Sequence, residues 1–225
     1  MLFYMASVMA DVKVGDTIPY FYEGDTLWYI VKTSSVTLTK PEKDQNNGHY
    51  YGTHTQPSGK VIVADSVEVN GKKLPVSGAN GLVFYGLKGI SEVIYQAPIA
   101  SLGGSAFSYS SVTRITVPKT VKDFNNGTFQ RTTNLDTIIF ENLEVVPSSA
   151  WDTWINCGVF SSISNNFWRI ENFIFGYSGN VPNNVLNIPE GVVGISSYMS
   201  RSAANATEVK AIVLPSTIKK FVRGA

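Results

Sequence analysis

Large apolar residues between Val121 and Phe140 follow neither the period of a helix nor that of a strand. They lie at Val121, Phe124, Phe129, Leu135, Ile138 and Phe140, with polar and small residues between them. Such uneven intervals are typical of a segment that bends several times and turns one side chain inward at each bend. A single segment of this kind cannot enclose its own apolar side, so the pattern predicts that the segment is repeated.

The pattern does recur, at a spacing of 22 or 23 residues. All six apolar positions have apolar counterparts one spacing earlier, at Ile99, Leu102, Phe107, Val112, Ile115 and Val117. Phe84 occupies the aromatic position of a still earlier copy, and later copies begin at Leu143, Val192 and Ile218. The last copy is cut short by the end of the sequence, so we expect a longer natural chain, a covering partner or an irregular end.

The copy that begins at Leu143 is interrupted. Its aromatic position falls at Trp151, and its second half is placed at Ile170, Phe173 and Phe175. This indicates an aromatic insertion over about residues 152–169, and insertions of this kind lie on one face of a solenoid, where partners often bind. Aromatic side chains contribute much of the energy of binding hot spots and also stack on sugar rings.

The candidate ligand-binding residues are therefore the aromatic residues of the insertion, namely Trp154, Phe160, Phe167 and Trp168. The alternative is that they fold back and fill the gap left by the interrupted copy, and we favour it for Trp154 and Trp168. Exposure of both tryptophans on the strand face would make the insertion the leading site.

The repeat length lies within the range of leucine-rich repeats, in which each unit contributes one short strand and stacks on its neighbours. Short β-branched strands are predicted at 113–117, 136–140 and 210–214. Pro118 and Pro215 follow two of them and end the ladder because proline has no N–H to donate. We predict a mainly β, right-handed leucine-rich-repeat solenoid with short strands and few or short helices.

The residues that form the repeat resemble a known family. Ile115-Thr116-Val117-Pro118, followed by Val121, Phe124, Phe129 and Leu135, is similar to the BspA-like leucine-rich repeats of bacterial surface proteins. Ser105-Ala106-Phe107 also keeps the Ala-Phe pair of that family. The resemblance covers residues 60–225 as the solenoid, with three departures. Trp151 replaces the phenylalanine, no apolar counterpart of that phenylalanine is clear between Ile195 and Val209, and the cysteine often seen after it is absent.

Residues 11–59 do not follow the repeat and are predicted to form an N-terminal β cap region. Segments 26–31 and 35–39 alternate as a β-hairpin would, and 41–59 is predicted to be a polar loop. Asn70-Gly71 lies between two alternating segments and predicts a type I′ hairpin. Residues 1–10 resemble the apolar part of a secretory signal, so they are interpreted as a signal-peptide remnant, with an ordinary first strand as the alternative.

Composition excludes some classes of function. The chain of 225 residues has a net charge of +1 and 16% charged residues, which gives no long-range field to attract nucleic acid. No apolar run is long enough for an integral membrane span. The single cysteine, Cys157, allows no internal disulfide.

No motif indicates catalysis, a metal or a cofactor, so the sequence predicts that the protein is not an enzyme. His49 and His54 have no metal-ligand spacing and are interpreted as solvated loop residues. Cys157 lacks a nearby histidine and is interpreted as an inert thiol. The acidic pairs Glu23 with Asp25 and Glu141 with Glu144 are interpreted as surface carboxylates, although each type of pair could supply an acid and a base.

The resemblance implies an extracellular or cell-surface binding protein of bacteria that adheres to a host or environmental macromolecule, either a protein or a glycan. One alternative is a polysaccharide-directed hydrolase, or its accessory module, that uses the insertion as its site. Another is a structural spacer domain. Loss of glycan turnover after substitution of Glu141 or Glu144 would favour the hydrolase.

Overall fold

The computed structural model describes residues 11–44, 48–141, 147–150, 152–160, 166–196 and 209–221. Residues 1–10, where the signal-peptide remnant is predicted, lie outside them. The described chain is mainly β, and its helices are two single-turn 3₁₀ segments, η1 (Gly158–Phe160) and η2 (Pro182–Asn184). Within these ranges no helix has the length and apolar character needed to cross a membrane.

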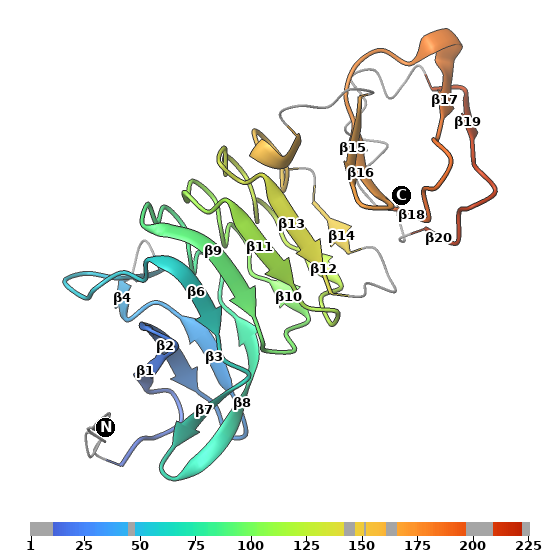
Figure 1. The fold of residues 1–225 in the computed structure, drawn as a ribbon. Helices are drawn as coiled ribbons and strands as arrows, with labels where there is room; N and C mark the ends of the chain where they lie inside the picture. Colours follow the sequence, from blue (N-terminus) through green and yellow to red (C-terminus); the bar gives the residue numbers. More distant parts are fainter. Residues whose placement is uncertain are drawn as a thin grey trace.

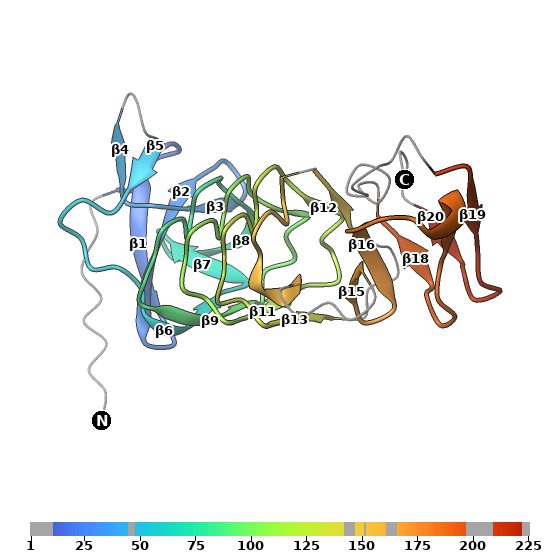
Figure 2. The ribbon, with the colours of Figure 1, turned by 90° about the horizontal axis from the view of Figure 1, so that it is seen from above.

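A five-stranded sheet covers the N-terminal end of the stack (Figure 2). In spatial order it contains β1 (Thr17–Tyr22), β2 (Asp25–Val31), β3 (Val36–Thr39), β8 (Lys72–Ala79) and β7 (Ser66–Val69). The β2–β3 and β7–β8 hairpins are confirmed. Asn70 and Gly71 both have positive φ, 49° and 73°, as a type I′ turn requires.

The prediction of a polar loop over 41–59 is wrong in its first half. Two short strands, β4 (Glu42–Asp44) and β5 (Gly48–Tyr50), pair there as an antiparallel hairpin. His54 follows this hairpin, and its Nε2 lies 2.9 Å from Oε1 of Glu42 while its ring contacts Trp28 at 4.6 Å between centroids. His54 is therefore a paired residue that joins the hairpin to the cap sheet, and not a solvated one.

The repeating coils form two parallel sheets (Figure 1). The first contains β6 (Gly59–Val63), β9 (Ile90–Tyr95), β11 (Arg114–Val117) and β13 (Thr137–Phe140). The second contains β10 (Ser101–Leu102), β12 (Asp123–Phe124) and β14 (Ser148–Ser149). Ile115 is level with Val93 on one side and with Ile138 on the other, so the predicted stacking of these strands is confirmed. The sequence predicted one strand per coil, but each of these coils also contributes a second, two-residue strand to the other sheet.

Buried aromatic rings run through the middle of the coils. Phe84 stacks on Phe107 at 5.3 Å between ring centroids, and Phe107 on Phe129 at 5.7 Å. The next ring in the row is Trp154, which stacks on Phe129 at 4.9 Å and is only 2% exposed. Burial of each large apolar side chain contributes roughly 1.5–3 kcal/mol, so the row is a major source of stability that no single coil could provide.

The assignment of Trp151 to this row is wrong by three residues. The amide of Phe107 donates to the carbonyl of Thr128, and the amide of Phe129 donates to that of Thr153, so Trp154 is the equivalent of Phe129. Trp151 itself lies outside the described residues. The predicted insertion over about 152–169 therefore begins too early, because its first residues belong to a regular coil.

A hairpin follows this coil and changes the direction of the chain. It consists of β15 (Phe167–Ile170) and β16 (Phe173–Tyr177), which pair antiparallel. The prediction placed Phe173 and Phe175 in the strand row of Ile138 and Phe140, but β16 instead pairs with β18 (Gly194–Ile195), which pairs with β20 (Lys220–Phe221). Because β15 and β18 occupy its two edges, β16 cannot extend the sheet of β13.

Beyond the hairpin, two further strands pair in parallel, β17 (Val185–Asn187) and β19 (Ala211–Val213). The core remains continuous across the hairpin, since the ring of Phe175 lies 6.0 Å from that of Phe140 and 5.1 Å from that of Trp154. The repeat coils and the hairpin therefore meet at Trp154, which is also where the candidate site lies.

Candidate functional site

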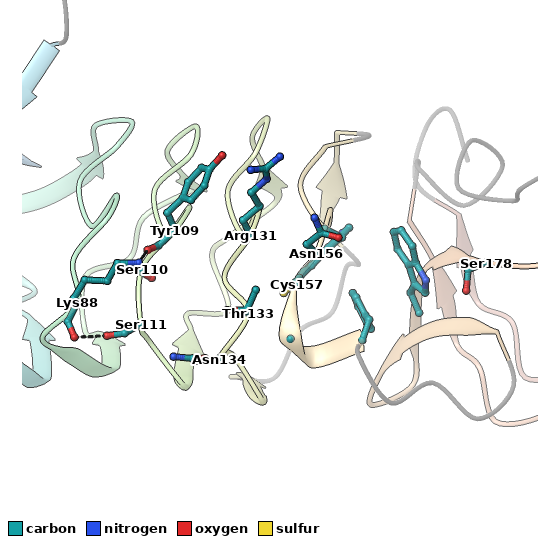
Figure 3. A pocket seen from close by; sticks show the side chains of 14 residues that line it. Lys88, Tyr109, Ser110, Ser111, Arg131, Thr133, Asn134, Asn156, Cys157 and Ser178 are labelled. Atoms are coloured by element: carbon teal, nitrogen blue, oxygen red, sulfur yellow. Dashed lines mark hydrogen bonds between the residues drawn. The ribbon is translucent and has the colours of Figure 1, made fainter.

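An open pocket of about 850 Å³ follows the turns that lead into β11 and β13 and reaches η1 and β15 (Figure 3). Successive coils each contribute part of its wall. The lining residues are Lys88, Tyr109, Ser110, Ser111, Arg131, Thr133, Asn134, Trp154, Asn156, Cys157, Gly158, Phe160, Trp168 and Ser178. We call this depression the turn pocket.

In each turn the residue two positions after the buried aromatic ring has a left-handed backbone. These residues are Gly86, Tyr109, Arg131 and Asn156, with φ of 71°, 60°, 56° and 54°. Glycine adopts this conformation without cost, whereas tyrosine and arginine do not. Figure 3 shows Tyr109, Arg131 and Asn156 in one row along successive turns.

Hydrogen bonds between coils hold the turns in place. The amides of Gly86, Tyr109 and Arg131 donate to carbonyls of the following coil at 2.9, 3.2 and 2.7 Å. Ser111 Oγ lies 2.7 Å from the carbonyl oxygen of Lys88 and 2.9 Å from that of Ile90, which ties this turn to the preceding coil (Figure 3). The backbone of the turns is thus largely satisfied, and the pocket offers side chains to a ligand.

Two cations face the turn pocket. Nζ of Lys88 donates to the carbonyl of Tyr109 at 2.5 Å, and the guanidinium of Arg131 lies 5.4 Å from the centroid of the Tyr109 ring. Over the described residues, neither cation forms a salt bridge, and the pocket lining contains no aspartate or glutamate. The described lining therefore has a positive charge.

The other end of the pocket is aromatic. Phe160 and Trp168 are half-buried and stack at 5.6 Å between ring centroids, with 17° between their planes. Trp154 contacts Phe160 edge-on at 5.2 Å but is itself buried in the core. Phe167 is buried against Tyr177 and is not part of the lining, so the structure brings three of the four predicted aromatic residues together at the pocket.

The preference for internal packing is confirmed for Trp154. Trp168 is partly packed and partly accessible, because one of its faces packs on Phe160 and its side chain still lines the pocket. The condition that both tryptophans be exposed on the strand face is not met. A site at this place depends on Phe160 and Trp168 for its aromatic part.

Two buried donors in the pocket wall have no hydrogen-bond partner. They are Oγ of Ser110 and Nε1 of Trp154. An unsatisfied buried donor costs roughly 1–3 kcal/mol, and an indole N–H can only donate. Both atoms are buried within the wall, so they offer no hydrogen bond to a ligand that lies in the pocket.

Cys157 also lies in the wall and has no nucleophilic character. Burial raises the pKa of its thiol to about 12, so the thiolate is scarce at neutral pH. In the described ranges, no group of three His, Cys, Asp or Glu side chains is arranged to hold a metal ion. Glu141 is exposed on the surface, and Glu144 lies outside the described residues, as does the side chain of His49.

Comparisons with known proteins identify the repeats. Residues 80–181 match the family described as BspA type leucine rich repeat region, in 6 copies. These coils are BspA-type leucine-rich repeats.

Several solved structures are similar to the chain. The pneumococcal vaccine antigen PcpA is 11% identical, with a TM-score of 0.42, over 92% of this chain and 72% of that one. A leucine-rich repeat protein from Eubacterium ventriosum is 17% identical, with a TM-score of 0.37, over 92% and 62%. A leucine rich cell surface protein from Faecalibacterium prausnitzii is 15% identical, with a TM-score of 0.31, over 89% and 77%. No curated protein matches the chain.

The BspA-type pattern also corrects one departure noted from the sequence. With Trp154 as the aromatic residue of its coil, Cys157 is the third residue after it, which is the position of Leu87, Ser110 and Thr132 in the other coils. All of these side chains are buried. The expected cysteine after the aromatic residue is therefore present in this repeat, and its apparent absence followed from the wrong choice of Trp151.

The sequence interpretation missed the cationic part of the turn pocket. Lys88, Tyr109 and Arg131 were not singled out from the sequence, because each lies in a different copy of the repeat. The signal was available in the repeat alignment itself, since Gly86, Tyr109 and Arg131 each follow the aromatic ring by two residues. Equivalent positions in successive coils of a solenoid lie next to one another. A change from glycine to residues with larger side chains along such a row therefore indicates a candidate binding surface.

Proposed function

We propose that this BspA-type repeat protein acts on the bacterial surface and binds an extracellular macromolecule noncovalently through the turn pocket. One observation carries the proposal: side chains from successive coils build a single open pocket, while most of the turn backbone beneath it is used in the stack. Concave sites with a few polar groups and aromatic rings are typical of ligand binding. The family to which the repeats belong supports the surface location.

A polysaccharide hydrolase is less well supported by the described residues. Glycoside hydrolysis commonly needs two carboxyl groups on either side of the scissile bond. The described lining of the turn pocket provides no carboxyl group, and Glu141 is not among its residues. The arrangement favours binding over turnover.

The proposal is tested with an array of immobilised matrix proteins, mucins, and acidic and neutral polysaccharides. We expect the protein to bind at least one of them, and Trp168→Ala and Tyr109→Gly to weaken that binding about tenfold each, as loss of interface aromatics does. Tyr50→Ala is the matched control, because Tyr50 is an exposed ring on β5 outside the pocket. Equal binding by all variants would place the recognition surface elsewhere.

A further inference from the structure

The turn pocket combines two features that suit different parts of one ligand. At one end, Lys88 and Arg131 are held by neutral groups, a carbonyl and an aromatic face, and not by carboxylates. Their charge is therefore available to an anionic group, and a guanidinium can bind a carboxylate or sulfate through two parallel hydrogen bonds. This end favours a ligand with repeated negative charges, since the cations come from separate coils.

At the other end, Phe160 and Trp168 form a stacked, half-buried pair. A flat aromatic surface of this kind binds the apolar C–H face of a sugar ring as well as other flat or apolar groups. The lining also contains the hydroxyl and amide groups of Thr133, Asn134 and Asn156. Hydroxyls and amides both donate and accept hydrogen bonds, which matches the hydroxyl groups of a saccharide.

An extended acidic peptide fits the pocket less well. Peptides in extended conformation usually add to an exposed sheet edge through main-chain hydrogen bonds. Here the amides of Tyr109 and Arg131 already donate within the stack, at 3.2 and 2.7 Å. At these two positions the pocket therefore offers side chains and not free main-chain amides.

We propose that the turn pocket binds an acidic saccharide, a sugar polymer whose carboxylate or sulfate groups pair with Lys88 and Arg131 while one ring stacks on Trp168. The inference rests on the proposed function, because it names the ligand class of the same site.

The test measures affinity by titration calorimetry with hyaluronan, polygalacturonate and heparin, beside carboxyl-reduced or desulfated forms of the same polymers. We expect at least one acidic polymer to bind and its neutral form to bind at least about tenfold more weakly. Lys88→Gln, Arg131→Gln and Trp168→Ala should each weaken binding about tenfold, and added salt should weaken it further. Lys72→Gln is the matched control, because Lys72 is an exposed lysine at the β7–β8 turn. Thermal melting verifies that each variant is folded.

Three results would overturn the inference. These are the absence of binding to all three acidic polymers, equal affinity for the neutral forms, and equally tight binding of poly-glutamate that depends on the same residues. In the second case, a continued loss of affinity in Trp168→Ala would leave the proposed function intact. If no pocket variant changes the binding of any macromolecule on the array, the proposed function itself is contradicted.

Discussion

Tyr109 and Arg131 occupy a backbone conformation that costs free energy for any residue with a side chain. In the equivalent turn of an earlier coil the residue is Gly86, which avoids the cost. Strained residues of this kind tend to be found at binding sites. Leu82 and Ser105 also have positive φ, 63° and 52°, but of these four residues only Tyr109 and Arg131 place their side chains in the lining of the turn pocket.

This argument predicts how substitutions of Arg131 affect stability. Arg131→Gly should change the free energy of unfolding by less than about 1 kcal/mol, because relief of the left-handed conformation offsets the extra freedom of the unfolded chain. Arg131→Val should lose about 1–2 kcal/mol more, because a β-branched residue is least compatible with positive φ. Urea unfolding of both variants measures the difference. Equal stability of the two would mean that the turn relaxes easily.

Lys40 is the most deeply buried cation among the described residues, at 7% exposure. Its Nζ donates to the carbonyl of Tyr85 at 3.3 Å and lies 5.8 Å from the centroids of the Tyr51 and Tyr85 rings. Burial removes water from the ammonium group and lowers the pKa of Lys40 to about 8. The unfolded chain therefore binds one more proton than the folded chain between about pH 8 and the ordinary lysine pKa of about 10.4.

The pH dependence follows from this difference. Stability rises with pH where the unfolded state binds more protons, so the free-energy cost of burying the Lys40 ammonium should decrease from pH 8 to about pH 10. Burial raises the pKa of Cys157 to about 12, and this acts in the opposite direction above its unfolded pKa. The contribution of Lys40 is isolated by subtracting the free energy of unfolding of Lys40→Met from that of the wild-type protein at each pH. This difference should increase between pH 7 and pH 10, and a constant difference would contradict the lowered pKa.

At the scale of elements, coils approach so closely that some turns exclude a Cβ atom. A Cβ on Gly103 would lie 2.5 Å from the carbonyl oxygen of Asn80 and 2.7 Å from the amide nitrogen of Gly81. The neighbouring Gly104 has room, since the nearest atom would be the carbonyl oxygen of Asn126 at 3.5 Å.

We therefore expect Gly103→Ala to lose about 2 kcal/mol or more of stability, because neighbouring backbone would have to move. Gly104→Ala should remain within about 1 kcal/mol of wild type. Chemical denaturation measures the free energy of unfolding of both variants. They form a matched pair because the two glycines are adjacent in one turn. A similar loss in both would show that the spacing between coils is not the limiting factor.

The strands and the stack could be predicted from the sequence because one spacing recurs through several copies. The position of the fourth aromatic ring could not. Leu102 is level with Phe124, a spacing of 22 residues, but Phe124 is level with Ser149, a spacing of 25. The extra residues lie between Phe124 and Ser149, before the ring, so a constant period selected Trp151 over Trp154.

The aromatic part of the candidate site was predictable for a different reason. Phe160 and Trp168 depart from the repeat, and departures in a solenoid are visible in the sequence. The hairpin of β15 and β16 was missed because it replaces a strand of the stack with an antiparallel pair whose side chains are equally apolar. Periodicity does not distinguish these two arrangements.

At the scale of the whole molecule, stability is shared along the aromatic row. Phe129 contacts Phe107, Phe124 and Trp154, so its ring joins consecutive coils. Phe129→Ala should cost about 3–5 kcal/mol through lost burial and the cavity that remains. Phe129→Leu should cost clearly less, because it fills part of the space. Thermal unfolding of both tests this, and a loss below about 1 kcal/mol in the alanine variant would contradict a shared core.

The central claim is that the stacked turns form the recognition surface of the molecule. Hydroxyl-radical footprinting tests it most directly, with the protein free and bound to the macromolecule that binds most tightly on the array. Bound ligand should protect Tyr109 and Trp168, while Phe21 and Tyr50, exposed rings outside the pocket, keep their reactivity. Protection of Phe21 or Tyr50 with Tyr109 and Trp168 unchanged would contradict the claim.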